Sequence, residues 1–588
     1  MAGLAVLIGE EATADAVVRM LEAAPHRGPV TEIYAETGMA LGVQARRDAP
    51  SFARSALRVD ADSAVATVGC LYDGESSTAA DDAAERLAEA CHGMSRPPRG
   101  AYVAVTVDRA HRRAAALRSA IGERPLFWRR AGRGRLALAS EVKQVAAAPW
   151  PAPRPDTDSA LALAALTFAD VESTAYPDIR RVPSATRLTV AGDEVKRERT
   201  WDPEALVGRA ATSVADARHE LRRLLDRAVS RRLDARTALL LSGGIDSTAV
   251  AATAAPMHRE RFEGSLLAVS ATYPDHPSAD ETGLIREVVE ALVLRSIEVT
   301  PRPRPLRDLG AQLALHDGPS VVAGAGSLEI LLDAAHGAGC TAALDGTDGD
   351  SLFGLRGDVG PALLRRSALK PLAALLRRDA GGRLAGWPRA VRNQLIAPMA
   401  GPRVREAYRE ARRRPPITPE APVWARPPLA DRLASPPGIA DPPGWRAKQA
   451  AIHRGPLEVL LEVLERIGLA RGVTLLHPLA DQDLVEFFLS LPPEIKFPTP
   501  RSKALVRESF PDLPLSVTAR LEKPHFDDVA AAGAPPADLS AALAECPQVL
   551  PGVDWDALAL RGSNGAMSGT EVAMIVRVLQ ADRLVGAG

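Results

Sequence analysis

Short apolar runs separated by turn residues dominate the first 200 residues of the chain. Runs 101–107, 114–117 and 136–139 are rich in Ala, Val and Leu, with Asp-Arg and Gly-Arg-Gly segments between them. Such runs predict β-strands joined by turns. Runs 187–190 and 195–199 flank an Ala-Gly-Asp turn and predict a hairpin. The N-terminal part is therefore expected to be rich in antiparallel strands.

Strands alternate with helices from about residue 214 onward. Leucine and valine recur at helical spacing in 216–231, and apolar strands are predicted at 237–241, 265–271 and 340–345. Helices are predicted between them, over 247–255 and 279–293. This alternation predicts an α/β domain with a parallel, doubly wound sheet, which binds ligands at the carboxyl ends of its strands.

Composition shifts mark the boundaries of the predicted domains. A Ser/Thr-rich joint at 201–215 separates a domain over 1–205 from one over 214–588. Residues 360–445 are rich in Arg, Pro and Ala and predict a helical insertion with proline-containing loops. The basic run 404–414 is read as a solvated helical face, with a docking surface for an acidic peptide as the alternative.

The overall charge limits the classes of partner. The 588 residues carry 72 Lys and Arg against 73 Asp and Glu, a net charge of -1. No global field attracts nucleic acid or an anionic membrane, so neither is expected as a partner. The N-terminus lacks a basic start, no apolar run is long enough to span a bilayer, and the cysteines form no C-x-x-C pair. A cytoplasmic protein is expected.

The run Ser-Gly-Gly-Ile-Asp-Ser at 242–247 follows a Leu-rich strand and opens a helix. Free N–H groups at a helix start and the positive end of the helix dipole favour an anion such as phosphate. Gly243 and Gly244 let the backbone approach it closely, and Ser242 and Ser247 add hydroxyl donors. Asp246 would repel phosphate unless a divalent cation lay between them, which predicts Mg²⁺. The lysine of the Walker loop is missing.

This run resembles the S-G-G-x-D-S loop of the ATP pyrophosphatases, and the chance strand-to-helix turn is the alternative. Residues 345–354, Asp-Gly-Thr-Asp-Gly-Asp-Ser-Leu-Phe-Gly, resemble the S-G-E-G-S-D-E-x-F-G motif of asparagine synthetases. The runs 477–481, 503–508 and 520–526 resemble the P-F-L-D, K-x-x-L-R-E and R-x-K-x-x-F motifs of that family. The resemblance continues to within about 50 residues of the end.

The resemblance assigns roles to particular residues. Asp246 and Asp350 would hold Mg²⁺ on pyrophosphate oxygens. Lys523 would stabilise charge on the α-phosphate and the acyl-adenylate, and Lys503 would assist at the pyrophosphate. For either lysine a surface ion pair is the alternative. The residues expected to bind ATP are Leu241, Ser242, Gly243, Gly244, Asp246, Ser247, Val269, Asp345 and Gly346.

Runs in the first domain resemble the class II glutamine amidotransferase domain of asparagine synthetases, which implies the αββα layers of an N-terminal-nucleophile fold. These runs are 26–29, 69–74, 121–127 and 139–143. That family attacks glutamine with a cysteine at position 1 of the mature chain. Here residue 2 is alanine, and no cysteine precedes Cys70. The first domain is therefore expected to be a structural remnant in which His26 and Arg27 pack rather than catalyse.

A chain that makes no ammonia from glutamine is expected to receive its amine with the substrate. Relatives with this layout close rings: the β-lactam and carbapenam synthetases, and the lasso-peptide macrolactam synthetases. Thr347 stands where β-lactam synthetases have tyrosine and asparagine synthetases have glutamate, and it is no general base at neutral pH. A macrolactam synthetase depends most on holding a folded peptide in place.

The favoured reading is therefore an ATP- and Mg²⁺-dependent, AMP-forming ligase of the macrolactam type. It would join the N-terminal amine of a leader-free core peptide to an Asp or Glu side chain. The resemblance also implies a leader-binding protein and a leader peptidase as partners. A β-lactam-type small-molecule cyclase, an ammonia-dependent asparagine synthetase and a non-catalytic scaffold remain as alternatives.

Overall fold

The computed structural model describes most of the 588 residues. It leaves out residues 1, 51, 53, 75, 80–82, 168–169, 321, 323, 355–358, 401–420, 435–444, 500, 521–523, 564–566 and 588. The basic run 404–414 and the predicted catalytic Lys523 lie outside the described residues.

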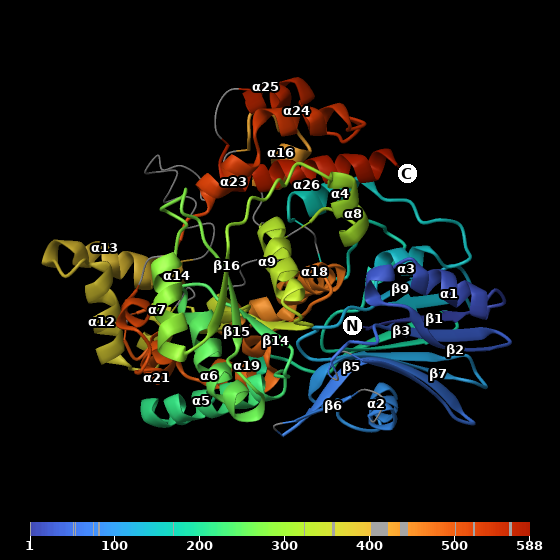
Figure 1. The fold of residues 1–588 in the computed structure, drawn as a ribbon, viewed down its shortest axis with the longest axis horizontal. Helices are drawn as coiled ribbons and strands as arrows, with labels where there is room; N and C mark the ends of the chain where they lie inside the picture. Colours follow the sequence, from blue (N-terminus) through green and yellow to red (C-terminus); the bar gives the residue numbers. More distant parts are fainter. Residues whose placement is uncertain are drawn as a thin grey trace.

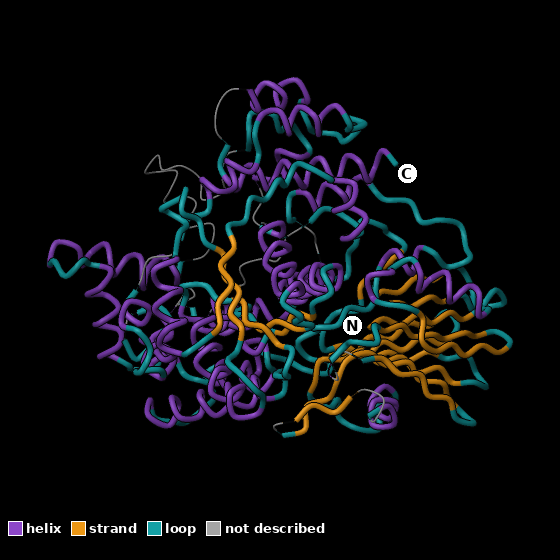
Figure 2. Tube along the Cα trace, in the orientation of Figure 1, coloured by secondary structure: helices purple, strands orange, loops and turns teal. Residues whose placement is uncertain are grey.

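Two antiparallel sheets make up the N-terminal part (Figures 1 and 2). The first has the order β11-β9-β10-β1-β3-β2, and its strands are β1 (Ala2–Ile8), β2 (Val30–Glu36), β3 (Met39–Ala45), β9 (Phe127–Arg130), β10 (Leu136–Ala139) and β11 (Ile179–Arg181). The second has the order β13-β12-β8-β7-β5-β4, with β6 paired to β5. Its strands are β4 (Ser55–Val59), β5 (Ser63–Asp73), β6 (Ser76–Ala79), β7 (Gly100–Asp108), β8 (Ala114–Arg118), β12 (Thr186–Ala191) and β13 (Glu194–Arg199).

The side chains of β1 alternate between two cores, as a strand buried on both faces requires. Leu4 and Val6 face the second sheet, whereas Leu7 packs beneath the helices α1 (Ala14–Glu22) and α3 (Val142–Ala146). The helix α2 (Ala84–Cys91) covers the outer face of the second sheet, below it in Figure 1. The layers are therefore helix, sheet, sheet, helix, which confirms the αββα prediction.

A third sheet has five parallel strands in the order β16-β15-β14-β17-β18. They are β14 (Thr237–Leu240), β15 (Leu267–Ala271), β16 (Arg295–Val299), β17 (Ala342–Leu344) and β18 (Thr474–Leu476). One face is covered by α5 (Val214–Ser230), α6 (Ile245–Arg261) and α7 (Thr282–Leu292), and the other by α9 (Ala325–Gly337) and α18 (Pro456–Ala470). The sheet is doubly wound, as predicted. Its strand order reverses between β14 and β17, where such sheets bind ligands.

The predicted helix 247–255 is too short at both ends. α6 begins at Ile245, directly after the glycines, and continues through Pro256 to Arg261. Proline inside a helix removes a backbone hydrogen bond, yet α6 continues past Pro256. The helix continues because its last turns are anchored: His258 is buried and its Nδ1 lies 3.3 Å from the carbonyl oxygen of Gly264.

A separate helical cluster lies at the top of Figure 1. It contains α23 (Asp527–Gly533), α24 (Pro536–Ala544), α25 (Trp555–Ser563) and α26 (Gly569–Gly586), together with α8 (Leu309–His316). The helix α4 (Thr157–Ala164) joins it, and Arg577 of α26 donates a hydrogen bond to the carbonyl of Ala164 at 2.8 Å. Residues 157–164 belong to the sequence range predicted for the first domain, yet they pack on the C-terminal helices. No helix in the described part of the chain is long and apolar enough to cross a membrane.

The described part of the predicted insertion is helical. It contains α11 (Val359–Arg365), α12 (Leu369–Asp379), α13 (Trp387–Val391) and α14 (Ala397–Met399), which project at the left of Figure 1. Leu372, Leu375 and Leu376 of α12 are buried against the core that also contains β14 and α6. These leucines recur at the spacing of one helical face, which explains why the segment docks on the main body.

The helix α18 joins the N-terminal sheets to the parallel sheet. Val463, Leu464 and Ile467 pack beneath the parallel sheet. Its other side carries glutamates whose partners come from the N-terminal part. Arg118 reaches Glu458 at 3.2 Å, Arg181 reaches Glu462 at 2.7 Å, and Arg27 and Arg124 reach Glu465 at 2.8 and 2.9 Å. All of these side chains are at most 8 % exposed.

We predict that Glu465→Ala destabilises the protein by about 3–5 kcal/mol, because it leaves Arg27 and Arg124 buried without their carboxylate. The matched control is Glu220→Ala, because the partner of Glu220, Arg223, is exposed. This substitution should lower the free energy of unfolding by less than about 0.5 kcal/mol. Scanning calorimetry of the first unfolding transition checks both. Equal melting temperatures for the two variants would contradict a buried network that holds the halves together.

Candidate active site

The loop after β14 is a compact turn built from its own serines. The Ser242 N–H donates to Ser247 Oγ at 3.2 Å, and the Ser247 hydroxyl donates to the Ser242 carbonyl at 3.1 Å. The Gly244 N–H donates to Ser242 Oγ at 3.3 Å, and Gly244 is the N-cap of α6. The hydroxyls predicted to bind phosphate therefore also shape the loop, at the positive end of a 17-residue helix.

The loop after β17 lies directly against this turn. A Cβ on Gly346 would stand 2.8 Å from the backbone nitrogen of Ser247, and one on Gly349 would overlap the carboxylate of Asp246. Only glycine allows the backbones to approach this closely. The two loops meet at the point where the strand order reverses. The structure thus brings Asp345 and Gly346 beside the Ser-Gly-Gly loop, as predicted.

Lys503 lies between the two carboxylates predicted to hold the metal. Its Nζ is bonded to Asp246 Oδ2 and lies 2.7 Å from Asp350 Oδ1. The lysine and Asp246 side chains are 9 % and 15 % exposed, whereas that of Asp350 is 62 % exposed. Two carboxylates thus converge on one cation position, with one of them open to solvent.

The two carboxylates would fit a magnesium ion that is completed by its substrate, once the Lys503 ammonium moves from between them. Mg²⁺ is commonly held by one or two carboxylates together with phosphate oxygens and water. Among the described residues no group of three or more His, Cys, Asp or Glu side chains could hold a metal by itself. Asp246 and Asp350 would therefore hold the ion only together with a phosphate group. The ion would in turn help to neutralise the charge of that phosphate.

Leu241 and Val269 flank the start of the loop. The Leu241 N–H donates to the Val269 carbonyl at 3.1 Å. Leu241 directly follows β14, Val269 is the middle residue of β15, and both side chains are buried. The residues predicted to border the nucleotide are therefore neighbours. Their contact with a nucleotide stays a prediction.

Hydrogen bonds to neighbouring residues hold Thr347. Its hydroxyl donates to Asp345 Oδ2 at 2.7 Å and its N–H to Asp345 Oδ1 at 3.0 Å. His477 Nδ1 lies 2.9 Å from the same Asp345 Oδ1. Burial by itself would lower the pKa of His477, but the Asp345 carboxylate outweighs it and raises the pKa above the usual 6.5. Asp345 therefore links the loop after β17 to the end of β18.

Glu281 is a residue of this region that the sequence motifs do not reveal. It precedes α7, and its Oε2 accepts a hydrogen bond from the Gly243 N–H at 3.2 Å, while its Oε1 pairs with Arg520. A single glutamate before a helix carries no motif, so only the Arg520 side of the pair was visible in the sequence.

The segment on the C-terminal side of Lys523 is held to the loop that follows β15. The His525 N–H donates to the Ser278 carbonyl at 2.9 Å, and the Phe526 ring meets Tyr273 edge-on at 5.6 Å. Arg520 on the other side is held by Glu281. Lys523 lies outside the described residues, but the described residues on both sides of it are anchored beside the Ser-Gly-Gly loop.

Arg27 lies beside the start of the N-terminal domain, near Ala2. Its guanidinium donates to the Ala2 carbonyl at 2.9 Å and pairs with Glu141 and Glu465. Cys70 is buried in β5, and burial raises the pKa of its thiol to about 11. A buried thiol of high pKa is a poor nucleophile. His26 and Arg27 both bond to Glu141 at the junction, and the expectation that this domain is a structural remnant stays a prediction.

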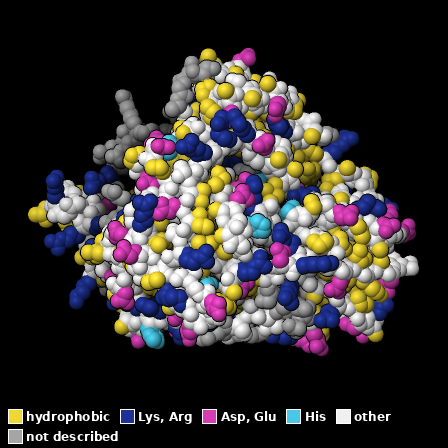
Figure 3. Space-filling model, viewed as in Figure 1, with side chains coloured by type: hydrophobic (Ala, Val, Ile, Leu, Met, Phe, Trp, Pro, Cys, Tyr) yellow, Lys and Arg dark blue, Asp and Glu magenta, His cyan; other side chains and the backbone are white. Residues whose placement is uncertain are grey.

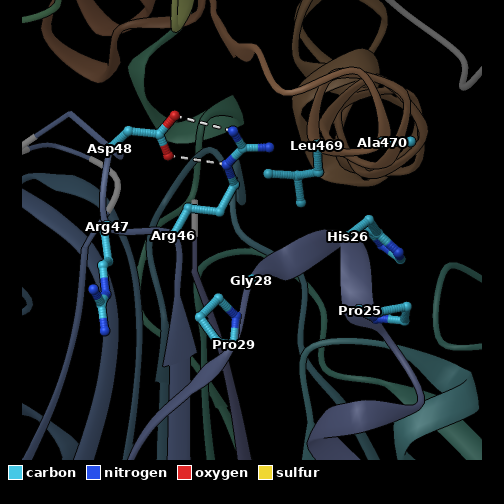
Figure 4. A pocket seen from close by; sticks show the side chains of 9 residues that line it. All are labelled: Pro25, His26, Gly28, Pro29, Arg46, Arg47, Asp48, Leu469 and Ala470. Carbon is cyan, nitrogen blue, oxygen red and sulfur yellow. Dashed lines mark hydrogen bonds and ion pairs between the residues drawn. The ribbon is translucent and has the colours of Figure 1, made fainter.

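A cavity of about 440 Å³ opens beside this junction (Figure 4). It lies between η1 (Pro25–Arg27), the segment after β3 and the C-terminal end of α18. Arg46 and Asp48 form a bidentate pair at its rim, with both bonds at 3.0 Å. The lining residues are Pro25, His26, Gly28, Pro29, Arg46, Arg47, Asp48, Leu469 and Ala470. None of them belongs to the candidate active site.

Comparisons with known proteins give matches to two family models. The model described as asparagine synthase matches residues 220–546, and the model described as glutamine amidotransferase domain matches residues 83–201. The second match includes the motifs at 121–127 and 139–143, whereas those at 26–29 and 69–74 lie outside it. No curated protein matches the chain.

Two solved structures are also similar in part. The first, titled as the allosteric regulatory enzyme of purine biosynthesis, is 12% identical, with 51% of this chain and 81% of that chain covered and a TM-score of 0.22. The second is a glutamine phosphoribosylpyrophosphate amidotransferase from B. subtilis complexed with ADP and GMP. It is 11% identical, with 58% of this chain and 80% of that chain covered and a TM-score of 0.21.

We predict that Asp246→Asn lowers ATP-dependent pyrophosphate release about 100-fold or more while the protein stays folded, because the amide removes the charge that would hold Mg²⁺ on the phosphates. Circular dichroism and a pyrophosphate assay measure the two effects. The control is Asp333→Asn on α9, a half-exposed residue away from the loops, which should retain the parent rate. Parent activity in Asp246→Asn would refute the metal assignment.

The His477–Asp345 pair should make stability depend on pH. Folding raises the pKa of His477 above 6.5. The pair therefore contributes its full stabilising free energy below about pH 6.5, and this contribution is lost as the pH rises through the raised pKa. The difference in melting temperature between the parent and His477→Gln should therefore be larger near pH 6 than near pH 9. A difference that grows with pH would contradict this assignment.

Proposed function

This chain belongs to the asparagine synthase family, whose model matches more than half of it, and we propose that it closes a macrolactam ring in a peptide. As a member of the family it is an ATP-dependent ligase that forms C–N bonds and releases AMP. The proposal names the two groups that the enzyme would join. They are the side-chain carboxylate of an Asp or Glu residue and the N-terminal amine of the same leader-free peptide.

The observation that carries the proposal is the contrast between the two halves. The ATP side has its loops, carboxylates and lysine assembled at the strand-order reversal. In the N-terminal half, Arg27 is bonded to the Ala2 carbonyl and the Cys70 thiol is buried. A ligase of this kind that obtains no ammonia from glutamine needs an amine that arrives with its substrate.

The chemistry has two steps. The substrate carboxylate attacks the α-phosphate of ATP, which forms an acyl-adenylate and releases pyrophosphate. The amine then attacks the acyl carbon, the acyl C–O bond breaks, and AMP leaves as the amine loses a proton. Asp246 and Asp350 would hold Mg²⁺ against the leaving pyrophosphate, with the Lys503 ammonium displaced from its position between them.

Thr347 supports a ring closure that relies on positioning. Both its hydroxyl and its N–H are bonded to Asp345, and a hydroxyl is no base at neutral pH. Holding an amine near its acyl partner replaces a bimolecular encounter by an intramolecular one, and well-oriented reactions of this type gain about 7–11 kcal/mol. A leader-binding protein and a leader peptidase are the partners proposed for supplying the peptide, in the cytoplasm.

We predict that ring formation, and with it sustained turnover of ATP, requires a linear peptide with a free N-terminus and an internal Asp or Glu. A peptide panel in which the acidic residue is moved along the chain, incubated with ATP and Mg²⁺, should yield one product lighter by the mass of a water. The matched control is the same peptide with an acetylated N-terminus, which should yield no ring. Mass spectrometry and the pyrophosphate assay measure both.

The same assay separates the alternatives. Turnover of free aspartate with ammonium would identify an ammonia-dependent asparagine synthetase, and turnover of small β-amino acids alone would identify a β-lactam-type cyclase. Product formation that needs added glutamine would overturn the remnant interpretation of the N-terminal half. No pyrophosphate release with any substrate would leave the scaffold alternative and contradict the proposal.

A further inference from the structure

A strongly basic lobe follows the candidate active site in the sequence. We define it as residues 359–399, which form α11, α12, α13 and α14. It contains seven arginines and one lysine against the single acidic residue Asp379, a net charge of +7 in a chain whose total is -1. The basic lobe forms the left end of the molecule in Figure 3, where dark blue side chains gather. So large a local charge attracts an anionic partner.

The basic lobe also exposes large aliphatic side chains. Fourteen large hydrophobic side chains are exposed in the described part of the chain, and five of them lie in these 41 residues. They are Leu364 (43 % exposed), Leu369 (64 %), Leu384 (87 %), Ile396 (59 %) and Met399 (61 %). Concentrations of exposed apolar side chains mark interaction surfaces more often than isolated ones do.

Folding of the lobe does not require these exposed side chains. Its inner face is supplied by Leu372, Leu375, Leu376 and Ala390, which are buried in the main core. Along the helical segment 387–399, in which 392–396 form a π-helical turn, Arg389, Ile396 and Met399 are exposed whereas Ala390 is buried. Charge and apolar surface therefore share the face that points away from the core.

Four of the eight cationic side chains in the basic lobe make no hydrogen bond or ion pair with the described residues. Arg366 pairs with Glu494 at 2.8 Å, and Arg389 donates to a backbone carbonyl. The side chains of Arg365, Lys370, Arg377 and Arg383 make no hydrogen bond or ion pair with the residues that the structure describes. A partner with carboxylates would gain favourable contacts on this surface without breaking existing ones.

We propose that the basic lobe is a docking surface for an acidic polypeptide whose carboxylates alternate with aliphatic side chains. The exposed Leu, Ile and Met side chains favour a polypeptide over a single-stranded nucleic acid, which is held by aromatic stacking together with basic residues. The aromatic residue of the lobe, Trp387, packs against the core. The combination of arginine and aliphatic surface matches a partner that offers both charge and apolar area.

The lobe is also placed to present such a polypeptide to the active site. Arg366 of the loop after α11 is tied to Glu494 of α20 (Pro493–Lys496), and α20 contacts α21 (Ala504–Ser509), which begins directly after Lys503. In the sequence, the lobe begins shortly after α10 (Gly349–Phe353), the helix that carries Asp350. The docking proposal does not depend on which ring or bond the enzyme forms.

The test is fluorescence anisotropy with a labelled synthetic peptide of alternating Glu and Leu. The parent protein should bind it, and the affinity should fall as salt is raised. A double variant with Arg377→Glu and Arg383→Glu should bind the peptide at least about tenfold more weakly than the parent. A second double variant, with Leu384→Ser and Ile396→Ser, should bind it about three- to tenfold more weakly. The control is a double variant with Arg133→Glu and Arg302→Glu, two side chains outside the lobe that are 92 % and 82 % exposed. Its affinity for the peptide should lie within about twofold of that of the parent.

Three results would overturn the proposal. The first is lobe variants that bind the peptide as the parent does while circular dichroism shows them folded. The second is equal binding of the matching peptide of alternating Lys and Leu. The third is tighter binding of labelled oligouridylate than of the acidic peptide, which would make the lobe a nucleic-acid surface. Failure of the ring-closure assay leaves these binding measurements unaffected.

Discussion

Buried carboxylates on α18 set the arrangement of the whole chain. Three glutamates on one side of this helix are almost completely removed from water, and a buried charge is tolerated only beside a partner. The partners are arginines that come from well-separated positions of the N-terminal sheets. The opposite side of α18 packs on the parallel sheet. The position of the N-terminal half relative to the strands that carry the active site therefore follows from satisfying these charges.

The same network explains what has become of the N-terminal half. Arg27 is bonded at once to the Ala2 carbonyl, to Glu141 and to Glu465 of α18, so its guanidinium is used by the junction. A group held in this way is not free to bind a substrate. The N-terminal layers place these arginines against α18, and the residues assembled for ATP lie at the reversal point of the parallel sheet.

Sequence patterns predicted the parts of the site that are formed by short local motifs. They did not predict the parts that depend on contacts between residues far apart in the chain. The Ser-Gly-Gly loop, the two aspartates and Lys503 were predicted from motifs, and the structure brings them together. Glu281 was missed because its role comes from its contact with the Gly243 amide. Glutamates spaced along α18 look like a solvated helix face in the sequence. They are buried because arginines far away in the chain cover them, which no local pattern contains.

Under the proposed function, the residue at position 347 bears on the choice of nucleophile. Thr347 is held by Asp345, and its hydroxyl is no base at neutral pH. The amine therefore has to arrive at least partly neutral. An N-terminal α-amine, with a pKa of about 7.7–8.0, is partly neutral near physiological pH, whereas a lysine amine at about 10.4 is almost fully charged. A threonine at position 347 is thus better matched to a peptide N-terminus than to a more basic amine, and the contribution of the site to the rate would lie in bringing that terminus to the activated carboxylate.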